Sequence, residues 1–119
     1  MRILFLSTWF PFPPDNGSKI RVYRLLRALA QRHSVTLFSF AFGTAEPDRL
    51  DGLAALCADV QRVSLNPFEV NRAGPLRTFL SAKPVASRSI AAMTRKVADA
   101  FDSERFDVVI ASTGMMASY

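Results

Sequence analysis

Apolar residues gather in short runs, and the stretches between those runs have a longer, helical spacing. The runs Arg2–Leu6, Ser34–Phe40 and Phe106–Ser112 are rich in apolar, β-branched and aromatic residues. Such runs are typical of strands buried on both faces of a parallel sheet. A weaker run with imperfect alternation, Asp59–Leu65, gives a fourth predicted strand.

Between the predicted strands, apolar residues return every three or four positions, which predicts amphipathic helices. We expect helices over Ser18–Arg32, Pro47–Ala58 and Ser89–Phe101. A shorter helix is expected to begin at Pro75 and to end before Pro84. The residues predicted to face inward are Ile20, Tyr23, Leu26, Leu29, Ala30, Leu50, Leu53, Ala54, Leu56 or Cys57, Ile90, Met93, Val97 and Phe101.

The elements follow one another in the order β-α-β-α-β-α-β. This alternation predicts an α/β fold, a Rossmann-like three-layer arrangement in which helices cover both faces of a parallel sheet. The chain has 119 residues, half of them apolar, which suits one hydrophobic core. Residues 1–119 are therefore expected to form one domain. No helix is predicted after the last strand, and we expect the sheet to continue in a longer protein.

The charge balance favours anionic partners. Fifteen Lys and Arg against ten Asp and Glu give a net charge of +5, which suits phosphates, acidic lipids or nucleic acid. Most aromatic residues fall in predicted strands or core faces, so a base-stacking surface is not expected and nucleic acid is not a predicted partner. The single cysteine, Cys57, is interpreted as a buried apolar residue in a reducing compartment. No apolar stretch approaches the ~20 residues of a membrane span, so we expect a cytoplasmic protein, with peripheral contact at the inner face of the membrane as an option.

The loop after the first strand is the first place to look for chemistry, because open parallel sheets bind ligands at the carboxyl ends of their strands. A dinucleotide-binding protein would carry G-x-G-x-x-G here, but this loop contains only Gly17. The phosphate-binding pattern G-x-x-x-x-G-K-[ST] is also absent. The sequence therefore argues against a nicotinamide or flavin enzyme and against a nucleoside triphosphatase.

The loop does provide the sequence "DNGSK" at a predicted helix N-terminus. Free backbone amides at such an end attract anions, and Gly17 would let a phosphate approach them closely. Lys19 and Arg21 add positive charge at the end of the helix where the dipole disfavours it, and a bound anion would remove that conflict. The competing interpretation is an ordinary turn with Ser18 as the N-cap and solvated basic side chains.

Other candidate groups are few. Ser112 and Thr113 follow the fourth predicted strand, where a substrate hydroxyl or phosphate would be met; the alternative is that they are plain turn residues. His33 and Asp107 are interpreted as structural residues at element ends. No Ser-His-Asp arrangement and no metal-ligand spacing is present, so no metal is expected.

The sequence also resembles a known family. The opening "MRILFLSTWFPFPPDNGSKIRVYRLLRALAQRHSVTLFSF" resembles the amino-terminal half of retaining family-four glycosyltransferases with the GT-B fold. The subgroup associated with exosortase and exopolysaccharide systems has the loop "PFPPDxGxKIR", which is matched from Pro11 to Arg21. "LCADVQRVSLNP" and "FDVVIAS" extend the resemblance over most of the chain.

This resemblance implies transfer of a sugar from a nucleotide-diphosphate donor to a hydroxyl acceptor, with retention of anomeric configuration, in cell-surface polysaccharide or glycolipid synthesis. It implies that Gly17 lies against the donor diphosphate and that Ser18, Lys19 and Arg21 face donor phosphate or acceptor. Many relatives have a histidine after the fourth strand, where this chain has Ala111 to Gly114. No cofactor is implied beyond the nucleotide-sugar substrate.

The resemblance further implies a second, nucleotide-sugar-binding domain, for which these residues have no counterpart. We therefore expect this chain to be the acceptor-side part of a transferase, inactive alone, whose partners are that domain and a sugar or lipid-linked acceptor. We also expect that an exposed sheet edge would let the chain pair with itself.

Two other functions stay open on the residues. One is a basic α/β module, not an enzyme, that binds an acidic membrane or protein partner. Its support is that residues 17–45 and 70–98 contain no acidic residue but five and six Lys or Arg. The other is a different nucleotide-dependent α/β enzyme, such as an epimerase or dehydrogenase, against which the missing glycine fingerprint argues.

Overall fold

The computed structural model describes residues 1–41, 51–64 and 91–119. The helix expected from Pro75 lies outside these residues. So do the first residues of two other predicted helices, Pro47 to Leu50 and Ser89 to Ile90, and the last residue of the third predicted strand, Leu65.

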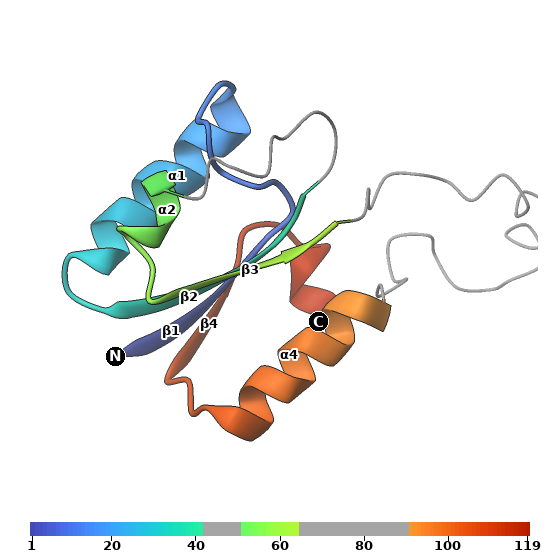
Figure 1. Ribbon diagram of the computed structural model, residues 1–119. Helices are drawn as coiled ribbons and strands as arrows, with labels where there is room; N and C mark the ends of the chain where they lie inside the picture. The colour runs from blue at the N-terminus through green and yellow to red at the C-terminus, as the bar shows by residue number, and fades with distance from the viewer. Residues whose placement is uncertain (42–50, 65–90) are drawn as a thin grey trace, which may run out of the picture.

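Four parallel strands form one sheet, which confirms the predicted α/β class. They are β1 (Arg2–Ser7), β2 (Ser34–Phe40), β3 (Asp59–Val63) and β4 (Val108–Ala111). Their spatial order is β3-β2-β1-β4 (Figure 1). β1 has neighbours on both sides, which explains why the apolar run at the start of the chain has almost no polar interruption.

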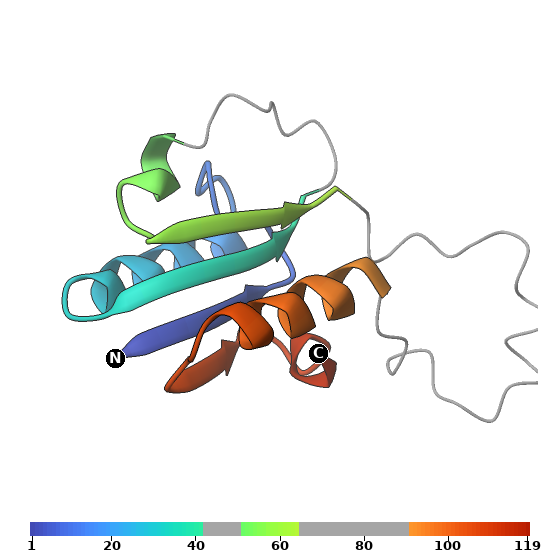
Figure 2. The same cartoon turned by 60° about the horizontal axis from the view of Figure 1, so that its bottom comes forward.

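Helices cover both faces of the sheet, as predicted. α1 (Gly17–Ala30) and the short α2 (Asp51–Ala54) lie on one face, and α4 (Ala91–Ser103) lies on the other (Figures 1 and 2). A 3-10 helix, η2 (Met116–Ser118), follows β4 on the α4 side. The pattern did not predict this last turn.

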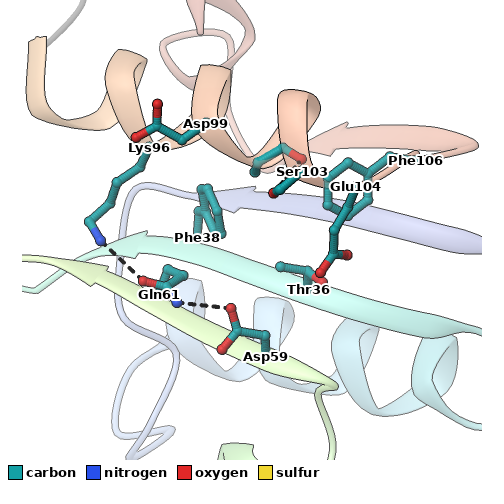
Figure 3. A pocket seen from close by; sticks show the side chains of 10 residues that line it. Thr36, Phe38, Asp59, Gln61, Lys96, Asp99, Ser103, Glu104 and Phe106 are labelled. Atoms are coloured by element: carbon teal, nitrogen blue, oxygen red, sulfur yellow. Dashed lines mark hydrogen bonds between the residues drawn. The ribbon is translucent and has the colours of Figure 1, made fainter.

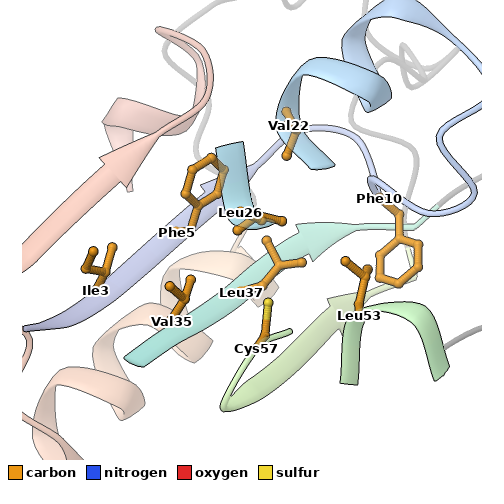
Figure 4. Packing of buried hydrophobic residues seen from close by; sticks show 9 residues of the cluster. All are labelled: Ile3, Phe5, Phe10, Val22, Leu26, Val35, Leu37, Leu53 and Cys57. Carbon is orange, nitrogen blue, oxygen red and sulfur yellow. The ribbon is translucent and has the colours of Figure 1, made fainter. Parts of the chain in front are cut away.

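The core on the α1 side is built from alternate residues of the central strands. Ile3 and Phe5 of β1 and Val35 and Leu37 of β2 pack there against helical side chains (Figure 4). The remaining buried members of this cluster are Phe10, Val22, Leu26, Leu53 and Cys57. The intervening strand residues point to the other face, as the two-residue period of a strand requires.

The core on the α4 side holds the other half of the strand residues. Leu4 and Leu6 of β1 meet Met93 and Val97 of α4, two residues that the helical spacing placed inward. Met116 is also fully buried in this cluster, so η2 closes the carboxyl end of the sheet on this face. The other buried members are Phe38, Phe40 and Val63.

Some inward positions were wrong. Phe101 is 47% exposed, since the buried stripe of α4 contains Met93 and Val97, and Phe101 instead lies edge-on to Phe106 at a ring separation of 5.6 Å. Ala54 is exposed as well, because α2 ends at that residue and the chain turns toward β3. In α1 the deeply buried pair is Val22 and Leu26.

Two neighbouring leucines of α1 test this packing directly. Leu26 is fully buried and Leu25 is 40% exposed. We expect Leu26→Ala to lower the free energy of unfolding by about 2–5 kcal/mol, because it leaves a cavity between α1 and the sheet. Leu25→Ala should change it by less than about 0.5 kcal/mol. Urea unfolding of both variants measures this; equal effects would mean that α1 packs through another face.

Candidate functional site

The strand order places a switch point between β1 and β4. The chain passes from β1 to β2 in one direction and reaches β4 on the opposite side of β1. In open α/β sheets, ligands bind at the carboxyl ends of the strands that flank this reversal. The candidate site is therefore formed by the residues that follow Ser7 and Ala111.

Three hydroxyl side chains meet at this point. The Oγ1 atoms of Thr8 and Thr113 are 2.8 Å apart, and the backbone N–H of Thr8 donates to Ser112 Oγ at 3.3 Å. Ser112 N also donates to Leu6 O at 2.8 Å, which extends the β1–β4 ladder by one bond. Ser112 and Thr113 were predicted site residues and lie together here. Thr8, only 1% exposed, was not predicted, because a single threonine after a strand carries no distinctive pattern.

The proline loop that follows Thr8 is anchored in the core by aromatic residues. Phe10 is 7% exposed and lies within the α1-side cluster, and the guanidinium of Arg62 lies 5.4 Å from its ring centre. Phe12 is half-buried, 6.1 Å from the Tyr23 ring. A Cβ placed on Gly52 would come within 2.5 Å of the Phe12 ring, so α2 packs closely on this loop. The loop that leads to α1 is thus held by packing as well as by proline.

The first turn of α1 is capped by Asn16, which corrects the interpretation of Ser18 as the N-cap. Asn16 Oδ1 accepts a hydrogen bond from Lys19 N at 3.1 Å, and Asn16 O accepts one from Ile20 N at 2.8 Å. The helix therefore begins at Gly17. Within the described residues, the amides of Gly17 and Ser18 have no hydrogen-bond acceptor, and both residues are exposed. These amides are the groups that an anion would meet.

Lys19 is already paired in the structure. Its Nζ lies 2.9 Å from Asp15 Oδ1, and the hydrogen bond from Lys19 lowers the pKa of Asp15 below its ordinary value of 3.8. Because this pKa is lower in the folded protein, the contribution of the pair to stability is fully present above the ordinary value and is lost as the pH falls through the lowered pKa. The positive charge of Lys19, which the sequence suggested would need a bound anion, is thus balanced by Asp15 within the loop. Arg21 is exposed and has no ion-pair partner in the described part of the chain.

Gly17 has open space around it. A Cβ at this position would meet no atom within 4 Å, and its φ lies outside the positive range that favours glycine. The fold therefore does not require glycine here. A ligand that approaches the helix tip closely would be one reason for glycine at this position.

The predicted residues form two groups. Ser112 and Thr113 join Thr8 at the end of the sheet, whereas Gly17, Ser18, Lys19 and Arg21 belong to the tip of α1. No hydrogen bond or ion pair links the two groups among the described residues. Each group follows the carboxyl end of a strand. The group at the tip of α1 follows the long loop after β1, and Ser112 and Thr113 come directly after β4 (Figure 1).

A separate groove of about 250 Å³ lies between α4 and the strands β2 and β3 (Figure 3). Lys96 Nζ donates to Gln61 Oε1 at 3.0 Å, and Gln61 Nε2 donates to Asp59 Oδ2 at 2.9 Å. Glu104 at its border is paired with Arg2. The polar groups named here are therefore paired within the protein. None of the predicted site residues lines it.

Two residues interpreted as structural are confirmed as such. Cys57 packs in the α1-side core (Figure 4), and burial raises the pKa of its thiol to about 11, so the thiol is neutral and a poor nucleophile at pH 7. Asp107 accepts a hydrogen bond from Arg2 N at 2.7 Å and so ties the start of β4 to β1. Among the described residues, no group of three or more His, Cys, Asp or Glu could hold a metal ion.

Comparison with protein-family models, curated proteins and solved structures finds no match to this chain. In the part of the chain that the structure describes, no helix is long and apolar enough to cross a membrane.

The assignment of the cap can be tested with two polar residues of the same turn. Asn16→Ala should cost about 0.5–2 kcal/mol of unfolding free energy, because the Lys19 amide loses its acceptor. Ser18→Ala should cost less than about 0.5 kcal/mol, since its hydroxyl caps nothing. Denaturant unfolding of both variants measures the two losses of unfolding free energy. A larger loss from Ser18→Ala would restore serine as the cap.

Proposed function

We propose that this chain is the acceptor-side α/β part of a retaining glycosyltransferase that moves a sugar from a nucleotide-diphosphate donor to a hydroxyl acceptor. The proposal rests mainly on the arrangement at the tip of α1. There the loop that resembles "PFPPDxGxKIR" leaves the exposed amides of Gly17 and Ser18 without an acceptor among the described residues, with open space beside Gly17.

The chemistry of such a transfer fits this arrangement. When the bond from the sugar to the diphosphate breaks, negative charge develops on the leaving diphosphate, and donors fixed before the reaction stabilise it most effectively. The Gly17 and Ser18 amides would supply donors from this side, and the exposed Arg21, which has no ion-pair partner among the described residues, would supply charge. Lys19 would contribute once the anion competes with Asp15 for it. The Thr8, Ser112 and Thr113 hydroxyls would meet a sugar hydroxyl or phosphate at the end of β4.

The first test removes access to the helix tip without disturbing the fold. Gly17→Val is expected to weaken binding of pyrophosphate and of nucleotide-diphosphate sugars by about tenfold or more, because its branched side chain occupies the space beside the free amides. Titration calorimetry measures the affinity, and circular dichroism checks the helix.

The matched control is Ala28→Val, which places the same side chain on an exposed position of α1 away from the tip. It should leave the affinity unchanged. If Gly17→Val binds as well as the unchanged protein, or if Ala28→Val weakens binding equally, the helix tip is not the diphosphate site.

A second candidate function, a basic module that binds an acidic membrane, is favoured by the exposed surface of α1. Arg21, Arg24 and Arg27 of α1, and Arg32 shortly after its end, are exposed and have no ion-pair partner among the described residues. Leu25, 40% exposed, lies between two of them in sequence. An apolar side chain among unpaired cations matches a surface of anionic lipid headgroups.

Vesicle sedimentation distinguishes this candidate. The unchanged protein should sediment with phosphatidylglycerol-containing vesicles and not with phosphatidylcholine alone. Because each basic residue near such a surface contributes about 1 kcal/mol, the double variant Arg24→Glu/Arg27→Glu should bind at least about tenfold more weakly. Arg95→Glu/Arg105→Glu, with the same change in net charge on exposed residues outside α1, should bind nearly normally. Binding that ignores lipid charge would exclude the membrane function.

A further inference from the structure

The loop between β1 and α1 contacts α2 at a glycine. A Cβ at Gly52 would lie 2.5 Å from Cε2 and 2.7 Å from Cζ of the Phe12 ring, whereas non-bonded carbon atoms prefer a separation of about 3.5–4.0 Å. The φ of Gly52 lies outside the positive range that favours glycine, so the backbone conformation does not require this residue. The Phe12 ring occupies the space that a side chain at this position would need.

Both sides of this contact are held by the α1-side core. Leu53, the next residue of α2, is fully buried in that cluster together with Phe10 of the loop (Figure 4). Phe12 is half-buried and packs against the same cluster, with its ring centre 6.1 Å from that of Tyr23 in α1. The ring therefore has neighbours on two helices, and a side chain at Gly52 could be accommodated only if the ring or α2 moved.

A short and stiff segment connects the Phe12 ring to the tip of α1. Three residues, Pro13 to Asp15, separate Phe12 from the N-cap residue Asn16. The two prolines of this segment have fixed φ angles, and the N–H of Asp15 donates to the carbonyl of Pro13 at 2.9 Å. Because few of its backbone angles are free to rotate, the segment should pass a displacement of Phe12 on to the helix cap.

We propose that Gly52 is a positioning residue: it leaves room for the Phe12 ring against α2 and thereby fixes where the loop places the Asn16 cap. A side chain at Gly52 would displace the ring and, with it, the exposed amides of Gly17 and Ser18. Groups that bind a ligand have to be held within about 0.5 Å of their productive geometry, so this displacement would weaken binding of a diphosphate. The effect on binding rests on the proposed function, whereas the placement of the loop does not.

The variant Gly52→Ala of the full 119-residue chain tests the placement. In the ligand-free protein, we expect the amide chemical shifts of Gly17 and Ser18 to change, because the loop that carries them is displaced. Pyrophosphate should bind about tenfold more weakly in titration calorimetry, with circular dichroism showing that the variant is folded. Ala54→Gln, which adds a larger side chain at an exposed position of α2, should change neither the amide shifts nor the affinity.

A change on the other side of the contact separates positioning from a general loss of stability. Phe12→Leu removes the two ring atoms that a Cβ at Gly52 would approach most closely. Adding Gly52→Ala to Phe12→Leu should therefore leave the Gly17 and Ser18 shifts as they are in Phe12→Leu alone. In urea unfolding, Gly52→Ala should lower the midpoint of the unchanged protein but raise that of Phe12→Leu, because alanine favours a helix over glycine once the clash is absent.

Each outcome of these measurements bears on the proposal. Gly17 and Ser18 shifts that Gly52→Ala does not alter would overturn it, as would equal effects of Gly52→Ala with and without Phe12→Leu. If Gly52→Ala alone does not fold, the double variant should, and its failure to fold would also overturn the proposal. If Gly52→Ala moves the two amides but pyrophosphate does not bind even to the unchanged protein, the positioning role is supported and the diphosphate function is not.

Discussion

The rest of the structure depends on the burial of β1 on both faces. Four consecutive residues of this strand, Ile3 to Leu6, are at most 2% exposed, which is possible only because β2 and β4 flank it and helices cover it from either side. Two hydrophobic clusters share this strand, one on each face. The same constraint fixes the switch point, since β1 is the strand at which the chain reverses its direction across the sheet.

The candidate site follows from that position. The chain leaves β1 at the carboxyl edge of the sheet, where Thr8 begins the next loop beside Ser112 and Thr113, the two residues that follow β4. The loop then has to reach the start of α1. Its aromatic residues Phe10 and Phe12 pack into the α1-side core, so the helix tip is held in place by the same cluster that holds the sheet. Fold and site therefore share their stabilising contacts.

Much of the fold could be predicted from periodicity, because buried strands and amphipathic helices leave distinct patterns. Periodicity found the β1 strand and the inward positions Met93 and Val97, but it wrongly placed Phe101 inward, where the structure leaves that side chain 47% exposed. The site was harder to predict for a different reason. The Asp15–Lys19 pair and the Asn16 cap both join residues that are close in sequence. The same local sequence is also compatible with Ser18 as the N-cap, and only the geometry of the structure distinguishes the two caps. Thr8 meets Thr113 across more than a hundred residues, a contact that no local pattern records.

The proposed function requires that a diphosphate-bearing ligand bind at the carboxyl edge of the sheet, near the tip of α1 and the end of β4. Mapping of amide chemical shifts by NMR during titration with pyrophosphate and a nucleotide-diphosphate sugar tests it most directly. The account predicts the largest shifts at Gly17 and Ser18, with smaller ones at Thr8, Ser112 and Thr113. Shifts confined to the groove between α4 and β3, or no saturable shift at all, would contradict it.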